Sequence, residues 1–140
     1  MLINSNLNSD AGLAEETLDD IYTQVLLDSA HHPQTKVSLQ NPDRQAEARN
    51  SSCGDAISVE LKLSPDGQII HQVGWRGDGC IISQAHMEGL ALALVGQKVT
   101  SLKTWTEIEM LKLFGLPNIS PGRLKCLMLG LTAVKQALAK

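Results

Sequence analysis

A strict alternation of apolar and polar residues at positions 57–63 most limits how this chain can fold. The apolar members are Ile57, Val59, Leu61 and Leu63. A period of two places all of them on one face of a strand. The next four residues read Ser-Pro-Asp-Gly, a turn signal in which proline fixes φ and glycine accepts a positive φ. Because a second strand is predicted at 69–75, the pattern indicates a β-hairpin with one buried face.

Helical periodicity dominates the chain after the hairpin. It predicts helices over residues 83–95 and 101–114 and a last helix that begins at Ser120. The last helix has the clearest signal, because Ser120 is a good N-cap and Pro121 suits the first turn. In the middle helix we expect four side chains to face inward: Leu102, Trp105, Ile108 and Leu111. The last helix carries an apolar stripe at spacings of three and four: Leu124, Leu127, Leu131, Val134 and Leu138.

The N-terminal third is predicted to hold one helix and a long loop. Residues 1–14 are polar and are expected to form a flexible tail. Residues 17–29 have an amphipathic pattern, and acidic residues near its start favour a helix. The apolar face of this helix consists of Leu18, Ile21, Tyr22, Val25 and Leu26. Residues 33–52 are polar and indicate a loop, with a short edge strand near 46–49.

These elements predict an α+β fold in which helices pack on one face of a small antiparallel sheet of about three strands. At 140 residues the chain can bury most of its apolar surface without disulfide bonds, and we expect a single domain over 15–140. Only 3% of the residues are aromatic, so the core is expected to be aliphatic.

Charge and hydropathy exclude two classes of partner. The net charge is -3 and the basic residues are scattered, whereas a nucleic-acid binder normally has a basic patch. The longest apolar stretch, at 90–95, is too short to cross a bilayer, and the N-terminus lacks the pattern of a signal peptide. We therefore expect a cytoplasmic protein that binds neither nucleic acid nor membrane.

The three cysteines and one aspartate lie at the edges of predicted elements. Cys53 and Asp55 precede the first strand of the hairpin. Cys80 follows a Gly-Asp-Gly turn, and Cys126 lies about one turn inside the last helix. Edges that contain glycine are places where side chains from distant segments can converge. In a reducing compartment, an odd number of cysteines indicates metal binding or thiol chemistry rather than disulfides.

Three thiolates and a carboxylate make a tetrahedral set that suits zinc or a small iron–sulfur cluster. The helix start and the neighbouring Arg123 and Lys125 are expected to lower the pKa of the Cys126 thiol. The spacing alone leaves plainer alternatives open. Free cysteines can be small buried hydrophobic residues, and Asp55 can be a turn or cap residue.

Three short motifs resemble those of the U-type iron–sulfur scaffold family, which includes IscU, SufU and the N-terminal domain of NifU. Residues 50–55, Asn-Ser-Ser-Cys-Gly-Asp, are similar to the family's Asn-Pro-x-Cys-Gly-Asp. Residues 77–83, Gly-Asp-Gly-Cys-Ile-Ile-Ser, are similar to its Gly-x-Gly-Cys-x-Ile-Ser. Residues 122–126, Gly-Arg-Leu-Lys-Cys, resemble the Arg-x-x-Cys that opens its C-terminal helix.

The resemblance implies a fold of the SufE/NifU type, a site and a set of partners. The implied ligands of a metal ion or cluster are Cys53, Asp55, Cys80 and Cys126. The implied function is a scaffold that builds or carries a cluster, [2Fe-2S] in the simplest case, and passes it to apo-proteins or cluster carriers. A cysteine desulfurase is the implied sulfur donor, and Cys126 is the expected persulfide acceptor.

Departures from the family pattern keep other functions open. Lys125 replaces the histidine of the scaffold branch, which favours a SufU-like, zinc-dependent sulfurtransferase that accepts persulfide sulfur. The stretch between Cys80 and Cys126 lacks the SufU insertion, which favours the scaffold. A structural zinc module that serves protein interaction is the third hypothesis. After Cys80, the family's run of small residues is interrupted by Gln84, His86 and Glu88.

Overall fold

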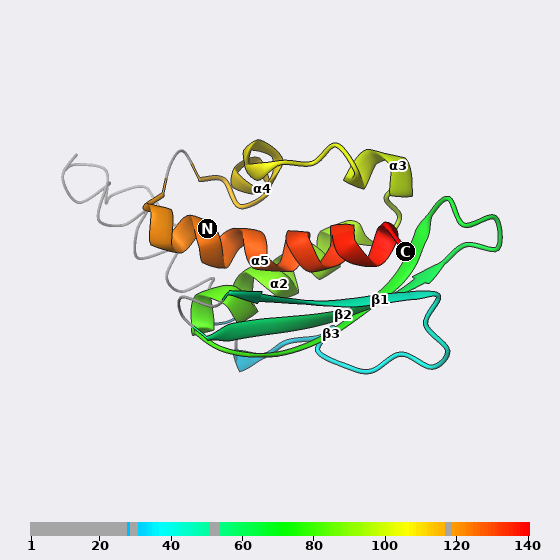
Figure 1. Ribbon diagram of the computed structural model, residues 1–140, viewed down its shortest axis with the longest axis horizontal. Coiled ribbons are helices and arrows are strands. Elements are labelled where there is room, and N and C mark those ends of the chain that lie inside the picture. Colours follow the sequence, from blue (N-terminus) through cyan, green and yellow to red (C-terminus); the bar gives the residue numbers. More distant parts are fainter. Residues whose placement is uncertain (1–27, 29–30, 51–53, 117–118) are drawn as a thin grey trace, which may run out of the picture.

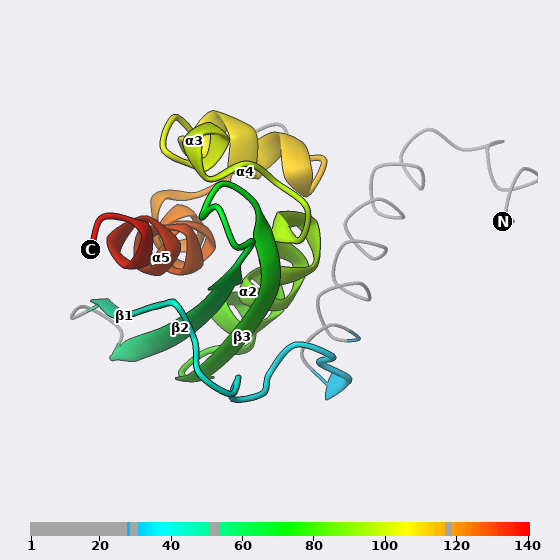
Figure 2. The same cartoon turned by 90° about the vertical axis from the view of Figure 1, so that its right-hand side faces the viewer.

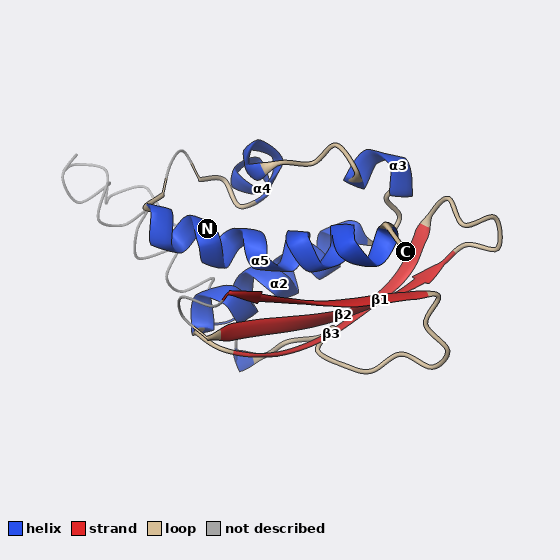
Figure 3. Ribbon diagram, viewed as in Figure 1, coloured by secondary structure: helices blue, strands red, loops and turns tan. Residues whose placement is uncertain are grey.

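Three antiparallel strands carry a layer of helices in the computed structural model, which describes residues 28, 31–50, 54–116 and 119–140 (Figure 1). The strands lie in the order β1 (Arg44–Asn50), β2 (Asp55–Leu63) and β3 (Ile70–Asp78). In the described part of the chain they are followed by α2 (Ile81–Leu94), α3 (Val99–Leu102), α4 (Glu107–Leu113) and α5 (Pro121–Leu138). The helices lie on one side of the sheet (Figure 3). The predicted α+β architecture is confirmed.

The predicted hairpin is the pair β2 and β3, and its alternating pattern has the expected effect. Val59 lies opposite Trp75 in the register. The four alternating apolar residues of β2 are buried: Ile57, Val59, Leu61 and Leu63. β3 continues beyond its predicted end at Trp75, because its last residue, Asp78, still pairs with Ala56 near the start of β2. This longer pairing brings the start of β2 next to the chain that enters α2.

The first strand is longer than the sequence pattern predicts. The edge strand predicted near 46–49 is confirmed as part of β1, but the loop predicted on either side of it is wrong at 44–45 and 50, because β1 pairs with β2 along its whole length. Its buried side chains are Ala46 and Ala48, which are too small to give a strong hydrophobic signal. The packing of α5 directly over β1 supplies the burial that the sequence pattern does not indicate.

The core lies between the sheet and the two long helices, α2 and α5, which lie side by side over it (Figure 2). α5 packs on β1 and β2, whereas α2 packs on β3. The predicted start of α5 is confirmed: Ser120 Oγ accepts the Arg123 N–H at 3.4 Å, and Pro121 is the first helical residue. Four members of its predicted apolar stripe are buried: Leu127, Leu131, Val134 and Leu138.

The single helix predicted over 101–114 is wrong, because α3 and α4 take its place. A capping box starts α4 anew. The Thr106 N–H donates to Glu109 Oε1 at 2.6 Å, and Thr106 Oγ1 accepts the Ile108 N–H at 3.3 Å. The new start changes which residues face the core, so Ile108, expected inside, is 57% exposed. Leu102 is buried as predicted, and Trp105 and Leu111 pack partly buried against the core.

The predicted N-terminal tail and almost all of the helix predicted over 17–29 lie outside the described residues. Among the residues that the structure does describe, there is no helix with the length and apolar character needed to cross a membrane.

Candidate metal centre

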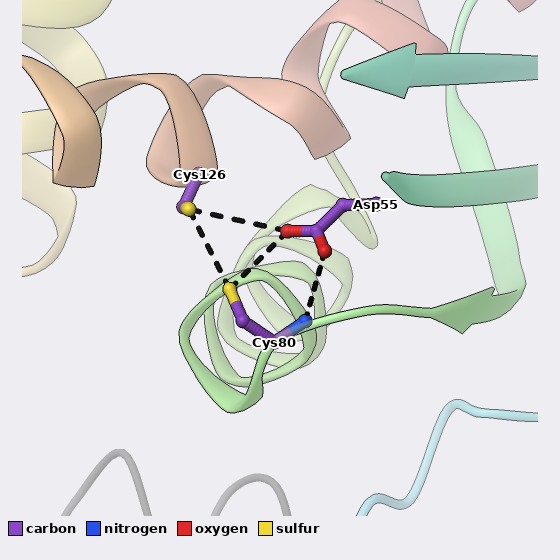
Figure 4. Close-up of side chains that lie close together, drawn as sticks. All are labelled: Asp55, Cys80 and Cys126. Carbon is purple, nitrogen blue, oxygen red and sulfur yellow. Dashed lines mark hydrogen bonds between the residues drawn. The ribbon is translucent and has the colours of Figure 1, made fainter. Parts of the chain in front are cut away.

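Side chains from three elements meet at one end of the sheet (Figure 4). Asp55 is the first residue of β2, Cys80 immediately precedes α2, and Cys126 lies in the second turn of α5. One ligand atom from each of these residues lies within 4.8 Å of the others. The structure therefore brings together three of the four predicted ligands. The fourth, Cys53, lies outside the described residues.

The open end of the hairpin holds Asp55 against the entry to α2. The Cys80 N–H donates to Asp55 Oδ1 at 3.0 Å. Gly79, just before it, has a φ of +142°, which L side chains rarely adopt. A Cβ at this position would also collide with the Asp55 carboxylate. Both the backbone conformation and the close approach of Asp55 therefore require glycine at position 79.

Cys80 is the N-cap of α2, which fixes the place of its sulfur. Its Sγ accepts the Ser83 N–H at 3.4 Å, so the helix predicted from position 83 begins two residues earlier, at Ile81. The Ser83 hydroxyl also donates to Asp55 Oδ2 at 2.7 Å. The sequence motif contains Ser83 without indicating this role. Ser83 lies three residues after the N-cap Cys80, and this is the spacing at which capping residues contact each other. That spacing is the sequence signal that could have indicated the role of Ser83.

The distances among the three side chains suit a tetrahedral metal site. Cys80 Sγ lies 3.2 Å from Asp55 Oδ2 and 3.5 Å from Cys126 Sγ. Cys126 Sγ lies 4.0 Å from the same carboxylate oxygen. On a tetrahedral zinc ion, two sulfurs lie about 3.8 Å apart, and a sulfur and an oxygen lie about 3.6 Å apart. The donor atoms thus already have nearly the spacing that a bound metal ion needs.

Burial divides the three ligands into two kinds. Asp55 is only 3% exposed, and Cys80 and Cys126 are partly exposed free thiols. The carboxylate is therefore held from inside the fold, while the two cysteine residues are partly open to solvent.

The predicted low pKa of Cys126 is wrong. Burial, and then the neighbouring Cys80 and Asp55, raise the pKa of the Cys126 thiol to about 11, although a hydrogen bond with Ser83 opposes them. The free backbone N–H groups that favour a thiolate lie in the first turn of a helix. Cys126 lies in the second turn of α5, beyond their reach. Arg123 and Lys125 are exposed, so their charges face water rather than the sulfur.

His86, which interrupts the small residues after Cys80, belongs to the core. Its side chain is 1% exposed, and its ring packs edge to face on Phe114 with the ring centroids 4.7 Å apart. Burial, with a smaller effect from Arg123, lowers the pKa of His86 to about 4. The imidazole is therefore neutral at neutral pH.

The sheet, its covering helices and the cysteine–carboxylate cluster define a small α+β protein with a candidate metal site. The chain belongs to the family of NifU-like N-terminal domains, whose family model matches residues 21–140. This match confirms the resemblance that the three sequence motifs indicate.

Known relatives resemble the chain over most of its length. The zinc-dependent sulfurtransferase SufU of Bacillus subtilis is 29% identical over 139 residues, which cover 88% of this chain and 92% of that protein. The iron–sulfur cluster assembly scaffold protein IscU of Thermotoga maritima is 28% identical over 135 residues, with coverage of 86% and 94%. The solved N-terminal structure of a NifU-like protein from Brucella abortus has a TM-score of 0.69 at 21% identity. It covers 87% of this chain and 94% of that chain, and it supports the fold.

Proposed function

We propose that this chain is an iron–sulfur cluster assembly scaffold. It builds or carries a cluster, [2Fe-2S] in the simplest case, on its three cysteines with Asp55 completing the site. The cluster then passes to apo-proteins or cluster carriers. The observation that carries the proposal is the approach of the ligand atoms of Asp55, Cys80 and Cys126 to within 4.8 Å of one another. The likeness to the scaffold protein IscU supports it.

The donor set suits a cargo that has to leave again. Asp55 offers a hard carboxylate oxygen, which binds a soft iron–sulfur unit less tightly than a fourth thiolate would. The partial exposure of Cys80 and Cys126 lets an acceptor protein approach the cargo directly. Weak ligation by Asp55 and access to the sulfurs together favour transfer over permanent storage.

A cysteine desulfurase is the proposed sulfur donor. A thiolate of the site attacks the outer sulfur of the desulfurase persulfide, the S–S bond of that persulfide breaks, and the desulfurase cysteine leaves as a thiolate. Cys126 as the acceptor stays a prediction, without the support of a low pKa. Labelled sulfur that still accumulates in Cys126→Ser, on Cys80 or Cys53, would contradict that choice. We propose a cytoplasmic location, because this exchange needs reduced thiols.

A zinc-dependent sulfurtransferase is the second candidate, and Lys125 favours it. This exposed lysine offers no metal ligand beside Cys126, so the proposed donor set consists of three sulfurs and one oxygen. Such a set completes a tetrahedral zinc site. Zinc would then stay on the protein, and sulfur rather than a cluster would be passed on. The likeness to SufU of Bacillus subtilis supports this candidate.

Protein purified without oxygen distinguishes these candidates. A scaffold supplied with iron and sulfide binds about one cluster per chain and transfers it to an apo-ferredoxin. A sulfurtransferase retains about one zinc ion, accelerates the desulfurase and forms no transferable cluster. A structural zinc module retains zinc and does neither.

Asp55→Ala tests the exchange role of the carboxylate within the scaffold proposal. The variant should hold its cluster longer and transfer it more slowly, because the weakest ligand is the route of exchange. Asp78→Ala is the matched control, since Asp78 is exposed at the end of β3. Transfer by Asp55→Ala at the rate of the parent and the control would contradict this role.

A further inference from the structure

The Ser83 hydroxyl is a buried polar group inside the candidate metal centre, and the proposed donor set does not include it. Ser83 is 2% exposed. Its Oγ donates to Asp55 Oδ2 at 2.7 Å and lies 3.4 Å from Cys80 Sγ. A further hydrogen bond joins its side chain to Cys126. One hydroxyl therefore contacts all three of the predicted ligands that the structure describes.

The two carboxylate oxygens of Asp55 have different contacts (Figure 4). Oδ1 accepts the Cys80 N–H at 3.0 Å, so the backbone holds this oxygen in place. Oδ2 is the oxygen that both sulfurs approach, Cys80 Sγ at 3.2 Å and Cys126 Sγ at 4.0 Å. A metal ion held by both sulfurs would therefore take Oδ2 as its oxygen ligand, and Oδ2 is also the oxygen to which Ser83 donates.

Oδ2 has room for one ligand besides Ser83. A carboxylate oxygen carries about two lone pairs, and the Ser83 hydroxyl and the Cys80 thiol each direct a proton at Oδ2. Cys80 gives up its proton when its sulfur binds a metal ion, and this frees one lone pair for that ion. The Ser83 hydroxyl keeps its proton and continues to occupy the other lone pair. Asp55 is thus restricted to binding through one lone pair of one oxygen.

The hydrogen bond from Ser83 favours the free carboxylate over the metal-bound one. It withdraws electron density from Oδ2, and this weakens the bond between the oxygen and a metal ion. Hydrogen bonds to a full negative charge are also the strong ones, so the bond from Ser83 is strongest when no metal shares that charge. Water has little access to replace it, because Asp55 and Ser83 are both buried. Ser83 therefore stabilises the state in which Asp55 has released its metal.

We infer that Ser83 is a positioning residue that keeps Asp55 a weak, single-oxygen ligand and so speeds release from the site. This inference rests on the proposed function, because it requires a site that binds a metal ion or cluster through Asp55. It goes further by assigning the ease of release to a hydroxyl that is not itself a ligand. A hydroxyl that only supported the ligands would have the opposite effect, since the loss of such a group typically weakens metal binding by about 10- to 100-fold.

Zinc titration of the full chain against a chelating dye tests the inference. Ser83→Ala removes the hydroxyl but keeps the start of α2, because Cys80 Sγ accepts a backbone N–H at this position. We expect Ser83→Ala to bind zinc about tenfold more tightly than the parent and to release it to a chelator about tenfold more slowly. Ser83→Thr keeps a hydroxyl and should retain the parental values. Ser58→Ala is the matched control, because Ser58 Oγ donates to Glu47, a carboxylate outside the metal centre, at 3.3 Å. It should leave zinc binding unchanged.

The same change made in Asp55→Ala separates the inference from the proposed function. Asp55→Ala alone should weaken zinc binding, and adding Ser83→Ala should bring no gain in affinity, since the oxygen on which Ser83 acts is gone. Zinc binding that Asp55→Ala leaves unchanged would contradict the proposed site itself. If Asp55→Ala weakens binding but Ser83→Ala alone gives equal or lower affinity, only the inference is overturned. A gain that also appears in Ser83→Thr, or that persists in the double variant, would overturn it as well.

Discussion

Asp55 and Glu88 are both buried carboxylates, but their hydrogen-bond donors differ. Asp55 accepts from the Cys80 thiol, the Ser83 hydroxyl and one backbone N–H. Glu88 accepts from two backbone N–H groups, a threonine hydroxyl and the Trp75 indole. A thiol can release its proton to solvent when its sulfur binds a metal ion, and it then becomes a ligand of the same ion as the carboxylate, whereas a backbone N–H does not do this. The donors around a buried carboxylate thus decide whether it can serve as an exchangeable ligand or as a permanent clamp.

Glu88→Ala should have the largest effect on folding. It leaves the backbone N–H groups of Gln34 and Thr35 and the Trp75 indole without their acceptor. We expect the free energy of unfolding, measured with urea, to fall by about 3–4 kcal/mol. Glu88→Gln keeps an acceptor oxygen and should lose about half as much. A loss below about 1 kcal/mol for Glu88→Ala would show that water replaces Glu88 as the hydrogen-bond acceptor.

Asp55→Ala should destabilise the metal-free protein less, by about 1–2 kcal/mol. The Cys80 N–H and the Ser83 hydroxyl lose an acceptor, but they lie beside partly exposed sulfurs, where water can replace it. Asp78→Ala, an exposed change, should stay within about 0.5 kcal/mol of the parent in the same urea measurement. If Asp55→Ala lowers the free energy of unfolding as much as Glu88→Ala does, the two carboxylates stabilise the fold equally, which would contradict the contrast between them.

Gly79→Ala should disable the metal centre while the fold survives. Alanine in the left-handed region costs about 1 kcal/mol, as expected for Gly67→Ala at a φ of +75°, and it costs more at the φ of +142° of Gly79. At Gly79 the new Cβ also meets the Asp55 carboxylate, whereas at Gly67 it has nothing within 4 Å. Zinc titration should therefore give an affinity at least about tenfold weaker in Gly79→Ala alone. Equal affinities in the two variants would contradict the close approach of Asp55.

The smallest expected effect is the pH dependence that Glu88 contributes. Burial raises the pKa of this carboxyl, but its hydrogen bonds hold the pKa below the usual value of 4.5. Its stabilising effect is therefore complete above that value and is lost as the pH falls through the lower pKa of the folded state. Between about pH 6 and about pH 3, the stability advantage of the parent over Glu88→Gln should shrink. A stability advantage that stays constant over this pH range would contradict a charged Glu88 side chain in the folded protein.

Strong hydrophobic periodicity predicts the elements whose burial comes from their own pattern. The alternation in β2 and the stripe of α5 are examples, and both are confirmed. The predicted strand at β1 is too short because its buried side chains, Ala46 and Ala48, are small and give a weak hydrophobic pattern. Their burial comes from the packing of α5 on β1. The break between α3 and α4 is missed because the Thr106 capping box is polar and leaves the apolar spacing unchanged.

The motifs identify Asp55, Cys80 and Cys126, which the structure brings together. A glycine with a positive φ directly precedes Asp55 and Cys80, whereas Cys126 is placed by α5 itself. The pKa of Cys126 could not be predicted in this way, since its direction depends on burial by distant elements. The hydrogen bonds between Glu88 and Thr35 could not be predicted from the sequence either. Glu88 and Thr35 are 53 positions apart, and no local pattern relates them.

X-ray absorption by the zinc-loaded protein tests the central claim most directly, because it counts the atoms bound to the metal. If Asp55 and the three cysteines form one site, the parent should show about three sulfurs at about 2.3 Å and one oxygen at about 2.0 Å from zinc. Each of Cys53→Ser, Cys80→Ser and Cys126→Ser should show one sulfur fewer. Zinc without sulfur neighbours in the parent, or a sulfur count that these substitutions leave unchanged, would contradict the account.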